Sequence, residues 1–308
     1  MKSENLKGYI FALIATIAYS NVYIFSKAAL NEIPLAQFGS WWYTVVAVSC
    51  FLFALFNKKL RQFKNFGPKQ VKVLLVLGLL EIFTTTLFFL SIHIIEDPSV
   101  TSFLGNLYPV MVMLGGIFIL NERFGPVEIF GGFLALGGAF VISYTGGNTL
   151  STFFIKGTGV VFLNAIFATT ATLVVKVHVR KISPEILNLN RSIWLLLFSA
   201  IMFFILDEPY KFSGYALKNT MIGAVLEFLA ILTVYYSFQF IEASRSSIIQ
   251  TLKGIIVLIG SYIFFGIFPL AHQLIGGLIT ILGILIMTLA QAGILNIRKT
   301  RVNYNKRQ

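Results

Sequence analysis

The amino-acid sequence predicts an all-α polytopic membrane protein whose ten transmembrane helices form two inverted five-helix repeats. Three observations lead to this prediction. First, the 308 residues are 57% hydrophobic and 12% charged, and their mean hydropathy of +0.83 lies far above that of a soluble globular domain. Second, apolar runs long enough to cross a bilayer, which takes about 20 helical residues, recur almost from end to end. Third, the two halves of the chain repeat one another.

The predicted spans follow one another with short connections. They cover residues 8–29, 36–56, 71–93, 98–120, 126–145, 157–178, 184–206, 219–241, 244–266 and 269–293. Prolines support these limits, because the N–H that proline lacks would have no partner in the first turn of a helix. Four prolines stand at predicted starts: Pro98, Pro126, Pro184 and Pro269. Asp97 and Ser183 precede two of them, and their side chains are expected to cap the first free amides.

The basic residues predict the orientation of the chain in the membrane. With the N-terminus inside, 18 of the 24 Lys and Arg residues fall in cytoplasmic segments and four fall on the other side. The positive-inside rule therefore predicts both termini in the cytoplasm, and short loops favour a bacterial inner membrane. Because the cations alternate between loops, the net charge of +12 reflects topology, so nucleic acid is not an expected partner. No cofactor is expected.

Sliding the chain against itself shows the internal repeat. An offset of 146 places Glu81 on Glu227 without a gap across more than fifty positions, and an offset of 149 places Lys27 on Lys176. Five helices per copy is an odd number, so the second copy enters the membrane from the opposite side. Lys27 is then expected to snorkel outward and Lys176 inward. The predicted units are a first repeat, a second repeat and a basic cytoplasmic tail, at residues 1–148, 149–295 and 296–308.

Two glutamates lie deep inside predicted spans. Glu81 is about ten residues into its helix, roughly 15 Å deep at 1.5 Å per residue, and Glu227 is about eight into its own. An ionised carboxylate in hydrocarbon costs at least ~2.5 kcal/mol, so each needs a partner, a proton or water. One interpretation is a protonatable or substrate-pairing carboxylate at the repeat interface. The other is a structural glutamate with hydrogen-bond partners such as Thr84 and Thr85.

Two cations also lie within predicted spans. Lys253 is deep in its helix and shares one face with Ser246 and Gln250, at spacings i, i+4 and i+7, so this face is expected to look into a wet cavity. The alternative for Lys253 is an ion pair with Glu227. Arg191 is about seven residues into its helix, where it can serve a site or snorkel to the cytoplasmic surface.

Other residues complete the predicted site. Asn106, Tyr235 and Gln239 offer further polar lining, although each can equally be a helix-packing residue. Pro109 should kink its helix and serve as a gate or hinge, and its aligned position follows Gly254 directly. Small residues are expected to allow close helix contact within the fold or in a homodimer, at Gly131, Ala135, Ala139, Gly276, Gly277 and Gly283. Trp41 and Trp42 suit an interfacial aromatic belt.

One stretch of the repeat is similar to a known family. It reads SVTSFLGNLYPVMVMLGGIFILNERFGPVEIFGGFLALGGAFVI: a helix rich in small residues, a proline, then Glu-Arg before a glycine-rich helix. With the five-plus-five arrangement, this stretch and its second copy resemble the EamA-type branch of the drug/metabolite transporter superfamily over essentially the whole chain. Arg191, in ILNLNRSIW, resembles an arginine that this family often carries early in the second helix of a repeat.

The chain departs from the family pattern at two positions. Trp41 stands at the position that matches Arg191, and Phe268 stands where the family has a glutamate after the fourth helix. In the sugar-phosphate and nucleotide-sugar branches, basic residues in the ninth helix bind anions. The resemblance therefore makes Lys253 a candidate for binding a substrate carboxylate or phosphate.

The predicted function is secondary transport of a small metabolite (amino acid-like, sugar-related or drug-like) by alternating access, as an exporter coupled to protons or exchange. An enzyme is not expected, because there is no His-Glu-x-x-His, Gly-x-Ser-x-Gly or phosphate-loop motif and no metal cluster among three His. A channel would need rings of charge or carbonyls, and an ATP-driven pump would need a nucleotide-binding domain. The alternative is a lipid scramblase or a non-transporting scaffold.

Overall fold

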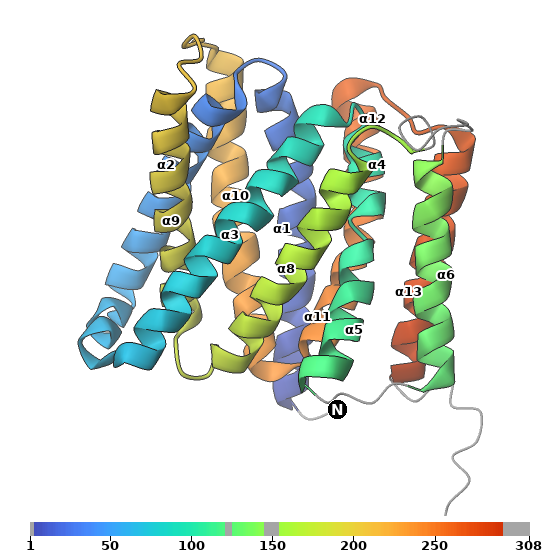
Figure 1. The fold of residues 1–308 in the computed structure, drawn as a ribbon, viewed down its shortest axis with the longest axis horizontal. Coiled ribbons are helices and arrows are strands. Elements are labelled where there is room, and N and C mark those ends of the chain that lie inside the picture. The colour runs from blue at the N-terminus through green and yellow to red at the C-terminus, as the bar shows by residue number, and fades with distance from the viewer. Residues whose placement is uncertain (1–2, 121–124, 145–153, 292–308) are drawn as a thin grey trace, which may run out of the picture.

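The computed structural model of the protein describes residues 3–120, 125–144 and 154–291, and these residues form a bundle of helices (Figure 1). The helices of the first half are α1 (Ser3–Leu30), α2 (Leu35–Phe56), η1 (Lys59–Asn65), α3 (Pro68–Ile94), α4 (Pro98–Leu104), α5 (Leu107–Leu120) and α6 (Pro126–Ser143). Those of the second half are α8 (Thr158–His178), α9 (Pro184–Ile205), α10 (Gly214–Phe240), α11 (Ala243–Ile249), η2 (Gln250–Leu252), α12 (Lys253–Phe265) and α13 (Ala271–Gln291). A single bridge, Tyr144 with Phe154, is the extended pairing found in the described part of the chain.

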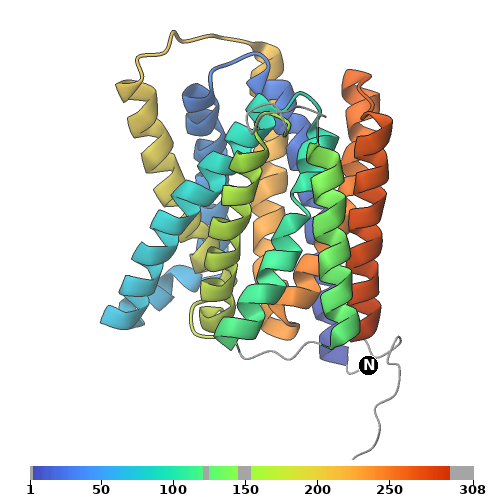
Figure 2. The same ribbon diagram turned by 45° about the vertical axis from the view of Figure 1, so that its right-hand side comes forward.

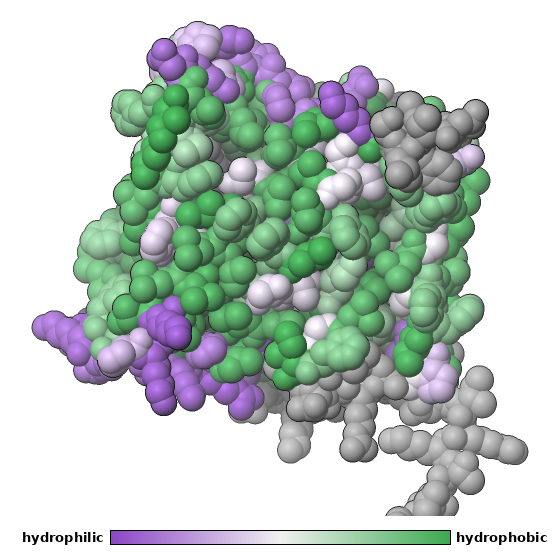
Figure 3. All heavy atoms as spheres, in the orientation of Figure 1, coloured by the Kyte–Doolittle hydropathy of each residue, from purple (hydrophilic) through white to green (hydrophobic). Residues whose placement is uncertain are grey.

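The apolar runs of the sequence are helical, as predicted. Seven of the described helices are long and apolar enough to cross a membrane, and 126–142 and 271–287 form shorter apolar helices. Figure 3 shows a face whose middle is covered by hydrophobic residues, with hydrophilic residues gathered at its upper and lower edges. The protein is therefore a multi-pass membrane protein, and the count of ten crossings stays a prediction.

Each end of α2 contacts the opposite end of α9. At one end of the bundle, the Gln37 side chain exchanges two hydrogen bonds with the backbone of Lys211, which joins the α2 start to the α9–α10 loop. At the opposite end, Gln62 of η1 contacts the backbone of Lys181 and Ser183 in the α8–α9 turn. The first turn of α2 thus lies beside the loop after α9, and η1, which follows α2, lies beside the turn before α9. Two repeats that run in opposite directions produce this pattern, and Figure 1 shows α1 and α8 running oppositely.

The two lysines that align in the repeat make equivalent contacts. Lys27 Nζ donates to the carbonyls of Ile92 and Ile95, both at 2.9 Å. Lys176 Nζ donates to the carbonyls of Phe238 and Ile241, at 2.7 and 2.6 Å, and these two residues follow Ile92 and Ile95 by the same offset of 146. The C-terminal carbonyls of α3 and α10 thus give each ammonium acceptors within the protein, which the snorkelling prediction did not include, and the direction of each lysine in the membrane stays a prediction.

The predicted helix caps have different outcomes. Asp97 caps α4 as expected, since its Oδ1 accepts from the Ser99 amide at 2.8 Å. Ser183 precedes α9 without a side-chain cap bond, so that prediction was wrong. Its amide donates to Gln62 instead, and the first position of α9 is Pro184, which needs no acceptor.

The fourth predicted span is broken before its proline. Helix α4 ends at Leu104 and α5 begins at Leu107, so the break lies at Gly105 and Asn106 and not at Pro109. Proline blocks the turn that precedes it, and Pro109 itself lies in the first turn of α5. The second repeat is also interrupted at its equivalent place, by the 3₁₀ turn η2 between α11 and α12, although no proline follows there. The break therefore belongs to the repeat and does not depend on proline alone.

The small residues of α6 and α13 bring these two helices together, side by side in Figures 1 and 2. A Cβ added to Gly131 would lie 2.5 Å from the carbonyl oxygen of Gly283, and one added to Gly276 would lie 2.7 Å from that of Gly138. Backbones this close allow only glycine. The predicted small-residue stripe thus serves contact within the chain. Residues Glu122 and Arg123 and the basic tail lie outside the described residues.

Candidate functional site

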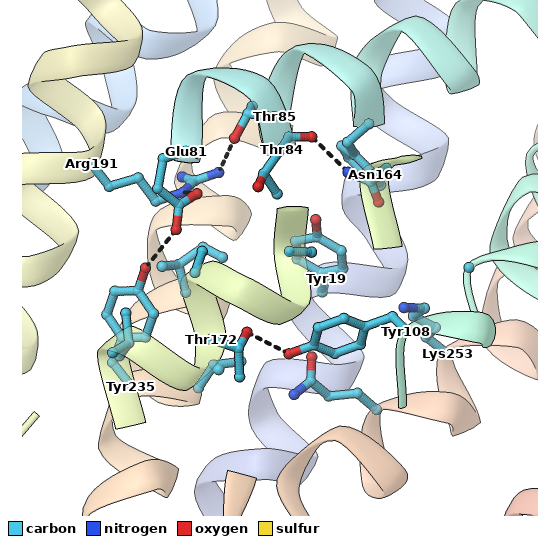
Figure 4. A pocket seen from close by; sticks show the side chains of 18 of the residues that line it. Tyr19, Glu81, Thr84, Thr85, Tyr108, Asn164, Thr172, Arg191, Tyr235 and Lys253 are labelled. Carbon is cyan, nitrogen blue, oxygen red and sulfur yellow. Dashed lines mark hydrogen bonds and ion pairs between the residues drawn. The ribbon is translucent and has the colours of Figure 1, made fainter. Parts of the chain in front are cut away.

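A polar cavity of about 110 Å³ lies inside the bundle, next to the helix breaks of both repeats. Its walls come from α1, α3, α5, α8, α9, α10, η2 and α12, so both halves contribute. Among the sequence-predicted site residues, five line it: Glu81, Arg191, Tyr235, Gln250 and Lys253. Figure 4 shows Glu81, Arg191 and Tyr235 together on one side of the cavity and Lys253 apart from them.

Arg191 of α9 joins the two repeat-related glutamates. Its Nε lies 2.9 Å from Glu81 Oε2 on α3, and its Nη2 lies 2.6 Å from Glu227 Oε1 on α10. All three side chains are buried, so their charges need partners within the protein, and the two ion pairs supply them. We refer to Glu81, Arg191 and Glu227 as the Glu–Arg–Glu triad. Arg191 is therefore a central residue of the site and does not snorkel to the surface.

Neutral side chains add hydrogen bonds to the triad. Tyr235 OH donates to Glu81 Oε1 at 3.3 Å, and Arg191 Nη2 donates to Thr85 Oγ1 at 3.1 Å. On the other side, Tyr43 OH donates to Glu227 Oε1 at 3.3 Å and the Trp42 indole N–H donates to Glu227 Oε2. The Arg191 Nη1 atom has no hydrogen-bond partner among the described residues.

Sequence reasoning missed the roles of Trp42 and Tyr43. Trp42 is completely buried against Glu227, so its predicted place in an interfacial belt was wrong. Its indole N–H needs an acceptor once buried, and the Glu227 carboxylate supplies one. The signal that could have found it is the alignment of Trp41 with Arg191, which places Trp42 one residue further along the helix that faces α9.

Lys253, the first residue of α12, is a buried cation that faces the cavity. Its Nζ lies 5.8 Å from the ring centroids of both Tyr19 and Tyr23 on α1, within the range of cation–π attraction. No carboxylate of the described residues forms an ion pair with it. The alternative pairing with Glu227 was wrong, because Arg191 occupies that carboxylate.

The remaining predicted residues lie elsewhere. Gln250 lines the cavity and donates to the Ser246 carbonyl at 3.4 Å. The Ser246 hydroxyl forms a hydrogen bond with the Ser237 hydroxyl. Gln239 does not line the cavity, and its Nε2 donates to the Val179 carbonyl at 3.1 Å. Asn106 is fully buried at the α4–α5 break, and its amide group has no hydrogen-bond partner in the described residues.

Glu227, Pro109 and Gly254 also lie outside the cavity wall. Glu227 is behind Arg191, on the side of Trp42 and Tyr43. Gly254 packs on Phe103, whose ring would lie 3.0 Å from an added Cβ. Close packing between α4 and α12 therefore explains this glycine without any role in the cavity.

The two ends of the cavity differ in charge. Two carboxylates and one guanidinium give the triad a net charge of −1 when both carboxylates are ionised, and Lys253 carries +1 at the other end. Buried charges need partners, and the triad has them, whereas the contacts of the Lys253 ammonium among the described residues are the aromatic faces of Tyr19 and Tyr23. A small anion that enters the cavity would find in Lys253 a cation that no described carboxylate already pairs.

Comparison with known proteins agrees with this architecture. Residues 6–144 and 155–289 each match the EamA-like transporter family. An uncharacterized transporter of Haemophilus influenzae (strain ATCC 51907 / DSM 11121 / KW20 / Rd) is 27% identical over 166 residues, which cover 52% of this chain and 53% of that protein. The chain thus spans about half the length of this relative.

A solved crystal structure of another protein superposes with a TM-score of 0.69 at 15% sequence identity. The superposition covers 92% of this chain and 99% of that one, and it shows a shared fold. The two family matches lie one in each half of the chain, on the helices that the internal repeat relates. The chain belongs to the EamA-like transporter family, with two copies of the family's repeat.

Proposed function

We propose that the protein is a secondary transporter that exports a small metabolite across a bacterial inner membrane by alternating access. The observation that carries the proposal is the polar cavity, with Lys253, which no described carboxylate pairs, at one end and the Glu–Arg–Glu triad at the other. It lies beside the interrupted helices of two oppositely running repeats, which is where carriers of this kind bind substrate. Such repeats can exchange two shapes around a site that stays fixed.

The proposed substrate carries an anionic group, either a carboxylate or a phosphate. Lys253 offers an ammonium whose neighbours are the rings of Tyr19 and Tyr23. An ammonium has three N–H donors, and the two ring faces do not provide hydrogen-bond acceptors for all of them. An anion bound there would replace the water that an unpaired ammonium needs. The tyrosine hydroxyls, Gln250 and Asn164 of the same wall offer hydrogen bonds for the rest of the molecule.

Glu81 is the proposed proton-coupling residue. It borders the cavity and shares Arg191 with Glu227, so a proton on Glu81 would leave Arg191 paired with Glu227 alone. Loss of the charge-assisted bond between Arg191 Nε and Glu81 would leave this N–H free to face the cavity and would change the electrostatic potential there. Protonation and substrate binding at the two ends of one small cavity would thus influence each other.

The proposed topology has ten crossings, with both termini in the cytoplasm. Its support is the charge bias of the loops together with the crossed arrangement of Gln37 with Lys211 and Gln62 with Lys181. By this topology, the Gln62 contact lies at the cytoplasmic face and the Gln37 contact at the opposite face.

The first test is a thermal-stability screen of the purified protein against amino acids, nucleotides, sugar phosphates, sugars and organic cations. A ligand at a hundred times its dissociation constant adds about 2.7 kcal/mol if it binds only the folded state. We expect one class with a carboxylate or phosphate to raise the unfolding temperature. No shift from any class would contradict a small-metabolite site.

The variant Lys253→Met tests the role of the ammonium. Loss of a hydrogen-bonded charge should weaken an anionic ligand by roughly 10- to 100-fold, since such a bond contributes about 1.5–3 kcal/mol. Lys218→Met, at an exposed position of α10, is the matched control and should bind normally. Unchanged affinity in Lys253→Met would contradict the role of the ammonium in ligand binding. A lower stability of the ligand-free variant would assign Lys253 a structural role.

A further inference from the structure

A second cavity, of about 210 Å³, lies beside the triad, and Thr85 lines both this cavity and the polar one. Helices α2, α3 and α9 form its walls, and most of its lining is apolar. One face of α9 and its C-cap residue carries four of the lining residues: Leu195, Phe198, Met202 and Leu206. We refer to the space between these three helices as the side groove.

The side groove is elongated. Leu195 and Leu206 are eleven positions apart on α9 and its continuation, which corresponds to about 16 Å at the helical rise of 1.5 Å per residue. One leaflet of a bilayer has a hydrocarbon layer of about 15 Å, half of the ~30 Å core. The length of the groove therefore suits an extended alkyl chain that lies along the membrane normal better than it suits a compact solute.

The two ends of the side groove differ. At the deep end lie Tyr43 and Thr85, which are both buried, and at the other end lies Leu206, which is 55% exposed. Glu208 lines the groove at this open end. Its Oε2 atom is buried without a hydrogen-bond partner, and no cation of the described residues forms an ion pair with it. A carboxylate so placed favours a cationic group at the mouth.

We propose that the side groove binds one chain of a phospholipid whose headgroup carries a primary ammonium, with the ammonium on Glu208 and the chain between α2, α3 and α9. The mouth lies at the end of α9, where its connection to α10 begins, so the headgroup stays at the membrane surface and the chain follows the leaflet inward. Apolar walls favour the alkyl chain through burial of its surface. Charge complementarity at the mouth selects the amine over an anionic headgroup.

The deep end of the side groove lies next to the triad. Tyr43 donates to Glu227 and Thr85 accepts from Arg191, and these two residues close the deep end of the groove. The end of the bound chain would therefore pack on the residues that hold the triad. Lipid binding does not depend on the transport proposal, so either can fail without the other.

Native mass spectrometry of the detergent-purified protein tests the site. Phosphatidylethanolamine, phosphatidylcholine and phosphatidylglycerol with identical chains are added separately, and bound lipid is counted against concentration. We expect one phosphatidylethanolamine per protein, bound roughly tenfold more tightly than phosphatidylglycerol, because an ionic hydrogen bond is formed with one headgroup and lost with the other. Equal affinity for the two lipids would overturn the role of the ammonium.

Two variants on neighbouring positions of α9 test the location. Met202→Trp places a large ring in the groove and should abolish the single bound lipid, whereas Ile201→Trp, on the exposed side, should leave it unchanged. Glu208→Gln should reduce the preference for phosphatidylethanolamine over phosphatidylglycerol to less than about threefold. Retention of the lipid in Met202→Trp would overturn the assignment.

A measurement on the wild-type protein covers the case in which Met202→Trp does not fold. Phosphatidylethanolamine with six-carbon chains offers the same headgroup but too short a chain for the groove. We expect it to bind at least tenfold more weakly than the long-chain lipid, since each buried methylene adds about 0.8 kcal/mol. Equal binding of both would show that the headgroup alone is recognised, at an adventitious surface site, and would overturn the proposal.

Discussion

The two glutamates that the internal repeat makes equivalent lie in different surroundings. Glu81 is 7% exposed and lines the polar cavity, where Arg191 and Tyr235 bind its carboxylate. Glu227 is 1% exposed and lies behind Arg191, with Trp42 and Tyr43 as further donors. One carboxylate can therefore exchange with the contents of the cavity, and the other is enclosed by protein.

The second helix of each repeat creates this difference. Arg191 comes from the second repeat, and its counterpart in the first repeat is Trp41. Helix α2 thus gives Glu227 an indole donor from the neighbouring Trp42, while α9 gives the guanidinium that both glutamates share. The repeat preserves the positions of the two carboxylates, and the second helices of the two repeats give them different partners. We infer that Glu227 holds the triad together and that Glu81 carries the coupling function.

The largest effect is expected from Arg191→Met. This change removes the shared partner and leaves two buried carboxylates side by side, and breaking a buried ion pair in this way costs about 3–5 kcal/mol. The free energy of unfolding, measured by denaturant titration in detergent, should fall by about that amount. Arg191→Lys keeps the charge but cannot contact both carboxylates in the same geometry. Its free energy of unfolding should therefore lie between those of the wild-type protein and Arg191→Met. A stable Arg191→Met protein would contradict the shared-partner account.

A smaller effect separates the two glutamates directly. Glu227→Gln should lower the free energy of unfolding by about 1.5–3 kcal/mol, because the charged carboxylate that Arg191 and Trp42 contact becomes a neutral amide in a closed environment. Glu81→Gln should cost clearly less, since water in the cavity can replace part of the lost interaction. The same denaturant titration compares both variants. Equal losses, or a larger loss in Glu81→Gln, would remove the distinction between the two sites.

The smallest effect is expected from the two tyrosines that donate to the triad. Tyr43→Phe and Tyr235→Phe each remove one hydrogen bond of 3.3 Å, worth about 1 kcal/mol or less. Tyr43→Phe should reduce stability, because Glu227 has no access to the cavity. Tyr235→Phe should leave stability nearly unchanged and shift the pH dependence of transport through Glu81. The reverse assignment of the two effects would count against the comparison.

The sequence predicted the helices and the repeat well, because both depend on local patterns. Apolar length, prolines at helix starts and the offset of 146 could be read without coordinates, and the aligned Lys27 and Lys176 do make equivalent contacts. The nature of those contacts was not predicted. A lysine near a helix end can reach water or the carbonyls of a neighbouring helix, and sequence spacing does not distinguish these two outcomes.

The sequence pointed to the three residues of the triad but not to the way they pair, and the function of the predicted site residues stays a prediction. Glu81, Glu227 and Arg191 were each identified from their depth in apolar runs, yet Arg191 was equally interpreted as an anchor. Helix packing decided the pairing, since α9 lies against both α3 and α10. Trp42 was missed because a tryptophan near the end of a span is commonly interfacial, and only its tertiary contact with Glu227 shows otherwise.

The most direct test of the central claim is transport by Glu81→Gln in proteoliposomes, with the ligand identified by the stability screen. Two fluxes are compared: exchange of labelled for unlabelled substrate at equal pH, and accumulation driven by an imposed pH gradient. We predict that Glu81→Gln keeps exchange and loses the response to the gradient, while wild-type protein shows both. Gradient-driven accumulation at the wild-type rate in Glu81→Gln would contradict the account and exclude Glu81 as the coupling residue.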